Sequence, residues 1–457
     1  MSSHGTVMGF SSILLPQLMS PDSPIEVDES SGSWIASVTG LTLLIGNIVI
    51  PPIMSKYGRK NANILSIIVM MIGWVCNVTA YNVPSLIFAR LLQGMALGMT
   101  ASMGSVLIGE YTSPKNRGAF LATISLFFTV GVLIVHTFGT FLNWHKTALV
   151  CAIISLGNLI IVMYSPESPS WLIDKKRYSE GEKVFRWLRG DSEENELRNI
   201  ISAKMATTEL KGDDGHKSVT GKFKDRISYF NQTIRKKEFY KPVLIMTHIY
   251  FLGQWSGANI LAAYTEDIFH SIIGEGINIK VMVISVDVQR FFSNFIAIFV
   301  IKKVKRRTVL AVTGGLNVAA YLITAGYCYS KDNDLLLFDH PYIGIMLIHF
   351  HMLSIATGTI PLPFILAGEL YPLEYRGLAG SISVLSLSFN VFVTTKTFPF
   401  ILSSLDIYGT YCLYASIVLY CLVIALIFLP ETKDRTLRDI EEEFRGHRTV
   451  PEQMKMS

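Results

Sequence analysis

Carboxylate and guanidinium side chains recur in the two halves of this chain at the same spacing. Glu110 is followed after six residues by Arg117, and Glu369 is followed after six residues by Arg376. In both copies the acid comes at the end of a long apolar run. These groups are suited to forming ion pairs, and their spacing resembles no nucleophile–base or metal-ligand pattern. We therefore expect no enzyme, no cofactor and no metal site.

Two further charged landmarks are duplicated in the same order. Tyr57-Gly-Arg-Lys60 returns as Val304-Lys-Arg-Arg307, and Pro166-Glu-Ser-Pro169 returns as Pro430-Glu-Thr-Lys433. A carboxylate on one helix end and a guanidinium on another can lock those ends together. The plainer interpretation is that such charges merely sit at the lipid headgroups, but the duplicated spacing favours a gate that opens when two halves rock. The predicted gating residues are Arg59, Glu110, Arg117, Glu167, Arg306, Glu369, Arg376 and Glu431.

The elements that must position these charges are membrane spans. Half of the residues are apolar and only 16% are charged, below the quarter typical of soluble domains. The apolar residues form blocks of about 20, which is enough for a helix to cross a bilayer. We expect twelve spans: 5–19, 33–54, 62–80, 85–108, 119–142, 147–164, 243–265, 281–301, 308–328, 341–366, 379–402 and 409–429. The first of these is short for a full crossing.

Charge in the loops predicts the orientation. Short loops on one side carry clusters such as Lys302–Arg307, whereas the alternate loop at 20–33 carries four acids and no Lys or Arg. By the positive-inside rule, both termini and the 165–242 loop lie in the cytoplasm of a multi-pass protein of the cell membrane. The basic stretches are orientation signals, and we expect no nucleic-acid partner.

The predicted organisation is two six-helix bundles around one soluble segment. The expected boundaries are 1–165 for the first bundle, 166–241 for a cytoplasmic loop with short helices, 242–430 for the second bundle and 431–457 for a cytoplasmic tail. In the tail, Leu437, Ile440 and Phe444 share one helical stripe, which predicts a docked amphipathic helix. Gly94-x-x-x-Gly98 is interpreted as a helix-packing motif.

The chain resembles the sugar porters of the major facilitator superfamily over essentially its whole length, and it looks most like the insect facilitated trehalose transporters. The resemblance is carried by motifs that are weak alone and specific in order: Gly58-Arg-Lys60, Arg90-Leu-Leu-Gln-Gly94, Glu110…Arg117-Gly118, Pro166-Glu-Ser-Pro-Ser-Trp-Leu172, Trp187-Leu-Arg-Gly190, Gln254-Trp-Ser-Gly-Ala-Asn259, Pro361-Leu-Pro363, Glu369…Arg376-Gly377, Thr395-Lys396 and Pro430-Glu-Thr-Lys433. It implies an all-α membrane protein with twelve helices in two bundles.

The same resemblance implies a sugar site. Gln254 and Asn259 match the span 7 residues that hold sugar in the family, with Ser256-Gly257 between them where the helix could bend or break. Tyr264 matches an aromatic residue that closes the outer side of the cavity. Polar packing between helices is the competing interpretation of the Gln–Asn pair.

Several family positions are altered. The first span 7 Gln is Gly253, the span 5 Gln is Ser125, the Trp after Pro-x-Pro is Phe364, and the Asn-Trp of span 11 falls on Leu387-Ser388. We expect weaker discrimination between close sugar analogues, or another solute. Ser55 and Lys302 replace gate carboxylates, and Lys305 replaces a Gly, so we expect a population shifted toward the inward-open state.

Buried ionisable groups bear on coupling. Asp287 and Arg290 lie three apart on span 8, and we expect them to neutralise each other. His349 and His351 face opposite ways on span 10, so at most one lines the cavity. Met8–Met19 contains no acid, whereas proton-coupled sugar porters carry one in span 1, so we expect facilitated transport.

The sequence thus predicts a monomeric uniporter that moves trehalose or glucose across the bilayer by alternating access. Two alternatives stay open: a carrier of another small polar solute such as a polyol, and a receptor that binds sugar without moving it.

Overall fold

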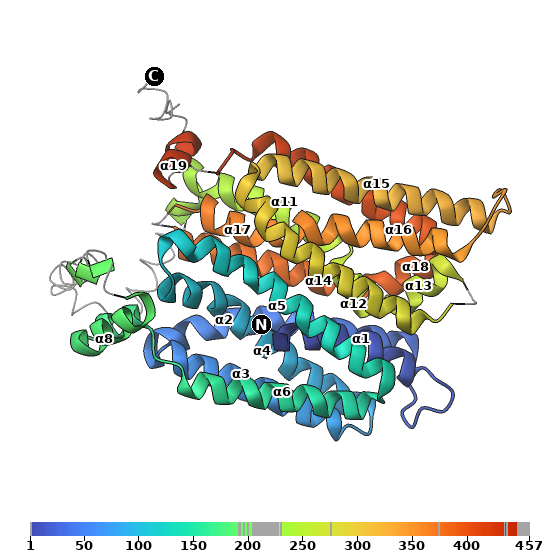
Figure 1. The fold of residues 1–457 in the computed structure, drawn as a ribbon, viewed down its shortest axis with the longest axis horizontal. Helices are drawn as coiled ribbons and strands as arrows, with labels where there is room; N and C mark the ends of the chain where they lie inside the picture. Colours follow the sequence, from blue (N-terminus) through green and yellow to red (C-terminus); the bar gives the residue numbers. More distant parts are fainter. Residues whose placement is uncertain are drawn as a thin grey trace.

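The described residues form twelve helical spans, and these are arranged as two halves (Figure 1). The computed structural model describes residues 2–190, 231–274, 277–372, 375–433 and 437–445, with isolated positions at 193–194, 197–198, 201–202, 228 and 435. The side chains of 105, 114–119, 122, 376–377 and 437–438 lie outside the description. The first half comprises α1 (Ser2–Leu18), α2 (Glu29–Tyr57), α3 (Arg59–Val78), α4 (Val83–Tyr111), α5 (Pro114–Phe141) and α6 (Trp144–Tyr164).

Two short helices follow the first half, α7 (Pro169–Asp174) and α8 (Tyr178–Arg189). The predicted stop at Gly190 is confirmed, because this residue has a φ of 72° and ends α8. The short helices expected to continue to about residue 210 fall largely outside the described residues.

The second half repeats the six-span plan with interruptions. It comprises α11 (Lys237–Trp255), α12 (Ala258–Ala263), α13 (Thr265–Ile273), α14 (Ile279–Lys303), α15 (Arg306–Asp332), α16 (Pro341–Ser354), the π-helical turn η3 (Ile355–Thr359), α17 (Pro361–Leu370), α18 (Arg376–Phe428) and, after the last span, α19 (Leu437–Arg445). The helix α18 contains two spans, since Asp406 has a φ of 54° and ψ of −179° and breaks it.

Span count agrees with the sequence prediction. Within the described residues, nine helical stretches are long and apolar enough to cross a bilayer, and the stretch over 378–428 holds two spans. The helix α1 and the broken α11–α12 pair complete twelve. With 17 residues, α1 reaches about 25 Å at 1.5 Å per residue, so its predicted shortness is confirmed.

Close helix packing holds the first half together. A Cβ on Gly94 would lie 2.1 Å from Thr42 Oγ1, and one on Gly98 would lie 2.0 Å from the Leu43 carbonyl oxygen. Only glycine lets α4 approach α2 this closely, which confirms the packing interpretation of this motif.

The halves meet along a few helices. In the ribbon, α5 and α1 of the first half lie beside α14 and α12 of the second (Figure 1). The helix α2 packs on α18, and α17 contacts both α11 and α5. Near the start of α2, Lys396 on α18 donates to Ser33 Oγ at 2.6 Å and lies 4.3 Å from the centroid of the Trp34 ring.

The C-terminal helix docks as predicted. Ile440 and Phe444 on α19 are buried, and the helix packs against α11 and α17. Arg445 lies 3.6 Å from Glu238 at the start of α11. The third member of the predicted stripe, Leu437, has a side chain outside the description.

Candidate functional site

A charged cluster joins three helix ends in the first half. The guanidinium of Arg59 donates to both carboxylate oxygens of Glu110, at 2.6 and 3.0 Å. Glu167, just after α6, accepts from the backbone N–H of Arg59 at 2.8 Å and so caps the start of α3. Ser168 donates to Glu110 at 2.5 Å. This arrangement ties the start of α3 to the ends of α4 and α6.

Gly58 is required by this cap. Its φ is 98°, and a Cβ there would lie 2.1 Å from Glu167 Oε2. A side chain at this position would displace the carboxylate that caps α3.

The second half repeats the cluster atom for atom. Arg306 donates to both oxygens of Glu369, at 2.9 and 3.3 Å, and Glu431 accepts from the backbone N–H of Arg306 at 2.9 Å. Thr432 takes the role of Ser168 and donates to Glu369 at 2.5 Å. Lys305 stands where Gly58 stands in the first half, and its φ of −60° is one any residue adopts. The second cap therefore needs no glycine.

Glu431 is held in its ionised form by the helix it caps. Burial disfavours its charge, but backbone N–H groups of Lys433, Arg306 and Arg307 outweigh burial and hold the pKa of this carboxyl below its ordinary value.

Each described ion pair of these clusters closes within one half. Arg59 pairs with Glu110 inside the first bundle, and Arg306 pairs with Glu369 inside the second. The expectation that such pairs open as the halves separate therefore falls on Arg117 and Arg376, whose side chains lie outside the described part of the chain. The gating role of the set stays a prediction.

Span 7 is broken where the sequence indicated. The helix α11 ends at Trp255, Gly257 adopts a left-handed conformation with φ 100° and ψ 0°, and α12 begins at Ala258. Gln254 and Asn259 flank the break, and the Asn259 amide donates directly to Gln254 Oε1. Both are partly exposed, whereas the four residues between them are buried. The break thus brings two partly exposed neutral amides together.

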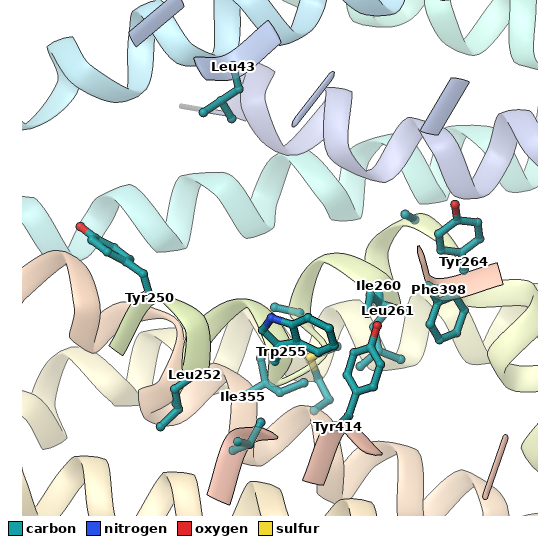
Figure 2. Close-up of a cluster of buried hydrophobic side chains, with 14 of the residues drawn as sticks. Leu43, Tyr250, Leu252, Trp255, Ile260, Leu261, Tyr264, Ile355, Phe398 and Tyr414 are labelled. Atoms are coloured by element: carbon teal, nitrogen blue, oxygen red, sulfur yellow. The ribbon is translucent and has the colours of Figure 1, made fainter. Parts of the chain in front are cut away.

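The other predicted sugar contacts lie on neighbouring helices. Phe364 on α17 is 37% exposed, Ser125 on α5 is buried, and α17 packs against both α11 and α5. Tyr264 is buried, and its hydroxyl donates to the Thr395 carbonyl at 2.9 Å; its ring lies beside Phe398 (Figure 2). Gln254 and Asn259 are therefore in direct contact. The helix of Phe364 lies beside the helix of Gln254, and the helix of Ser125 lies beside that of Phe364.

Neutral polar contacts between the halves were missed from sequence. Asn47 on α2 donates to Ser388 on α18 at 3.0 Å and accepts from Ser102 at 2.5 Å. Asn294 on α14 donates to Thr129 on α5 at 3.1 Å. Asparagine inside an apolar span was the available signal, since a buried amide needs a partner.

The expected pairing of Asp287 with Arg290 holds only in part: the carboxylate attracts the guanidinium electrostatically, but the described structure shows no direct ion pair between them. Asp287 accepts instead from His136 Nδ1 on α5 at 2.5 Å, and the other ring nitrogen of His136 lies 2.8 Å from Ser12 Oγ on α1. Arg290 lies over the Phe128 ring, 5.6 Å from its centroid. The spacing of Asp287 and Arg290 carries information only about their own helix, and it cannot indicate a partner on α5.

Both span 10 histidines make contacts inside the second half. His351 is buried and donates to the Ser256 carbonyl at 3.0 Å. His349 is half-buried and bonds with Gln289 on α14. The structure thus favours packing for both side chains.

A small cavity of about 10 Å³ lies beside the break, lined by residues that include Gly257, Tyr321, His351, Thr410 and Tyr411. Tyr321 and His351 already bond to backbone carbonyls, so few of its walls are free to bind hydroxyls. This space lies within the second bundle and differs from the Gln254–Asn259 position.

In span 1, hydroxyl and carbonyl oxygens take the place of a carboxylate partner. The buried Arg90 guanidinium on α4 donates to Ser11 Oγ at 2.5 Å, to the Val7 carbonyl at 3.0 Å and to the Ile35 carbonyl at 3.2 Å. This cation is therefore satisfied by neutral acceptors.

Two six-span halves, duplicated charged clusters and a discontinuous helix flanked by polar side chains are features typical of membrane transporters. A family model described as "Sugar (and other) transporter" matches residues 5–444. The chain belongs to this family and is a non-enzymatic, multi-pass membrane transporter.

Relatives and solved structures agree with this placement. The chain is 28% identical over 450 residues to the facilitated trehalose transporter Tret1 of Culex quinquefasciatus, covering 96% of this chain and 83% of the relative. It is 27% identical over 440 residues to the Tret1 of Bombyx mori, covering 95% and 83%. The fold matches the proton:xylose symporter XylE bound to 6-bromo-6-deoxy-D-glucose, with a TM-score of 0.75 at 18% identity over 97% of both chains. It also matches the inward-open conformation of XylE from E. coli, with a TM-score of 0.73 at 17% identity over 97% and 98%.

Proposed function

We propose that this protein moves a sugar, with trehalose or glucose as the leading solutes, across a cell membrane by facilitated alternating access. The observation that carries the proposal is the break in span 7 with Gln254 and Asn259 on its two sides. Neutral amides suit a solute whose hydroxyl groups lose water on entry, because they both donate and accept. The relatives named as facilitated trehalose transporters support the choice of sugar.

Facilitated transport, without proton coupling through span 1, is supported by Arg90. A coupling carboxylate beside this guanidinium would bind and release protons in each cycle, but Ser11 stands there. Both termini lie in the cytoplasm in this proposal, because the basic clusters at the α2–α3 and α14–α15 turns mark the cytoplasmic side.

Uptake of radiolabelled trehalose and glucose into oocytes with verified surface expression tests the proposal. We expect saturable uptake that a proton or sodium gradient does not change and that Gln254→Ala abolishes. The matched control is Gln232→Ala, since Gln232 is exposed in the cytoplasmic segment. Gradient-driven accumulation would contradict facilitated transport, and normal uptake in Gln254→Ala would contradict the site.

A second solute class is favoured by the short side chain at Ser125 and by the missing indole at Phe364. Fewer fixed donors accept a wider set of polyhydroxyl solutes. Competition of sugar uptake by polyols separates the two: inhibition and direct uptake of a labelled polyol would place polyols ahead of sugars.

A further inference from the structure

The break in span 7 frees backbone carbonyls that other helices satisfy. Where a helix stops inside the membrane, its last carbonyls lack N–H partners and cannot turn to bulk water. Tyr321 on α15 donates its hydroxyl to the Trp255 carbonyl at 3.0 Å. His351 on α16 and Asn317 on α15 both donate to the Ser256 carbonyl, at 3.0 and 3.2 Å.

These donors are buried and their roles are fixed by chemistry. Tyr321 and His351 are each 2% exposed, and Asn317 is fully buried. A carbonyl oxygen only accepts, so His351 Nε2 must carry a hydrogen. No bulk water reaches the two carbonyls to replace a lost donor, so each bond matters more than one at a surface.

The same side chains close on the glycine of the break. A Cβ on Gly257 would lie 2.6 Å from the Tyr321 hydroxyl and 3.1 Å from His351 Cε1. The Tyr321 and His351 rings are 4.3 Å apart between centroids. From α18, Asn390 accepts from the Trp255 indole at 3.2 Å, and Tyr414 lies beside the Trp255 ring (Figure 2). Side chains of α15, α16 and α18 thus all contact the break.

We infer that Tyr321, His351 and Asn317 form a clamp that positions the solute site and sets its selectivity. Gln254 lies just before the clamped carbonyls and Asn259 just after them, so the angle of the break fixes the separation of the two amides. The inference rests on the proposed role of Gln254 and Asn259. The clamp residues touch backbone and need not touch solute, so they are positioning residues.

Isosteric variants test the clamp. Tyr321→Phe removes one hydroxyl, His351→Leu removes one donor, and His351→Gln restores an N–H at similar reach. Tyr327→Phe is the matched control, since Tyr327 lies on the same helix and bonds Asp339 near its outer end. We expect Tyr321→Phe and His351→Leu to raise KM for the preferred sugar about tenfold, equivalent to about 1.4 kcal/mol, and to lower the ratio of uptake between that sugar and its epimers. His351→Gln and Tyr327→Phe should resemble the wild type.

A role in stability alone predicts another pattern. It would lower the amount of protein at the surface while leaving KM and the ratio between sugars unchanged. Unchanged KM and selectivity in both Tyr321→Phe and His351→Leu would overturn the inference, as would equal impairment of His351→Gln and His351→Leu.

A second measurement does not depend on the identity of the solute. Hydrogen exchange of the backbone over 250–264 in purified protein should be faster in Tyr321→Phe and His351→Leu than in Tyr327→Phe. Equal exchange would refute the clamp even if sugar uptake were found. Faster exchange in a protein that moves neither trehalose nor glucose would support the clamp and count against the proposed function.

Discussion

Breaking the buried pair between His136 and Asp287 should weaken the contact between the two halves. Asp287 is 3% exposed and His136 is 1% exposed, and their atoms lie 2.5 Å apart across α5 and α14. Removing one partner of such a pair leaves the other group uncompensated in an apolar setting and costs about 3–5 kcal/mol. We therefore expect His136→Leu, which leaves the buried Asp287 carboxylate without this partner, to lower the free energy of unfolding by about that amount.

The double variant makes the prediction specific. His136→Leu with Asp287→Leu leaves no carboxylate buried without a partner, so we expect it to be more stable than His136→Leu alone. The free energies would come from unfolding in mixed micelles by a denaturing detergent, arranged as a double-mutant cycle. A coupling energy of about 1–3 kcal/mol is expected for residues in direct contact. Additive effects, or a single variant within about 0.5 kcal/mol of wild type, would show that the pair does not hold the halves together.

Three further predictions follow from the duplicated charged clusters. Gly58→Ala should cost about 1–2 kcal/mol of stability because its Cβ would collide with Glu167, whereas Lys305→Ala at the equivalent position should be neutral; equal effects in thermal unfolding would contradict the two cap geometries. The pKa of Glu431 is lowered in the folded protein, so its cap stabilises the protein fully at pH values above the pKa of an unfolded glutamate, about 4.3, and this stability is lost as pH falls through the folded pKa. The difference in thermal unfolding midpoint between wild type and Glu431→Gln should therefore shrink on acidification. A difference that stays constant with pH would argue against this cap. Cysteines placed near Gly58 and Lys305 should be labelled readily without solute if the inward-open state predominates, and low accessibility would count against that shift.

The sequence alone predicted the features that repeat in the two halves and those that depend only on neighbouring residues. Twelve spans follow from apolar length, and the end of α8 and the break at Ser256-Gly257 follow from glycine. The duplicated charges could be found because their spacing repeats in the two halves. In the structure Glu110 pairs with Arg59, and Glu369 pairs with Arg306. Close packing at Gly94 and Gly98 was also readable, because small residues four apart share one helix face.

Contacts between distant helices could not be predicted in this way. Asp287 and Arg290 satisfy a local spacing rule, yet Asp287 bonds His136, 151 positions away. Asn47 and Ser388 meet across the halves, and nothing in either local sequence names the other. The clamp on the break was likewise hidden, since the carbonyls that it satisfies belong to the backbone and carry no sequence signal.

Solute uptake by wild type and Gln254→Ala tests the central claim most directly. Oocytes with matched surface levels would be given labelled trehalose and glucose at several concentrations, with and without a proton gradient. The account predicts saturable uptake of one of these sugars, independent of the gradient and lost in Gln254→Ala. Absence of uptake of both sugars at good surface levels, or uptake that Gln254→Ala leaves intact, would contradict it.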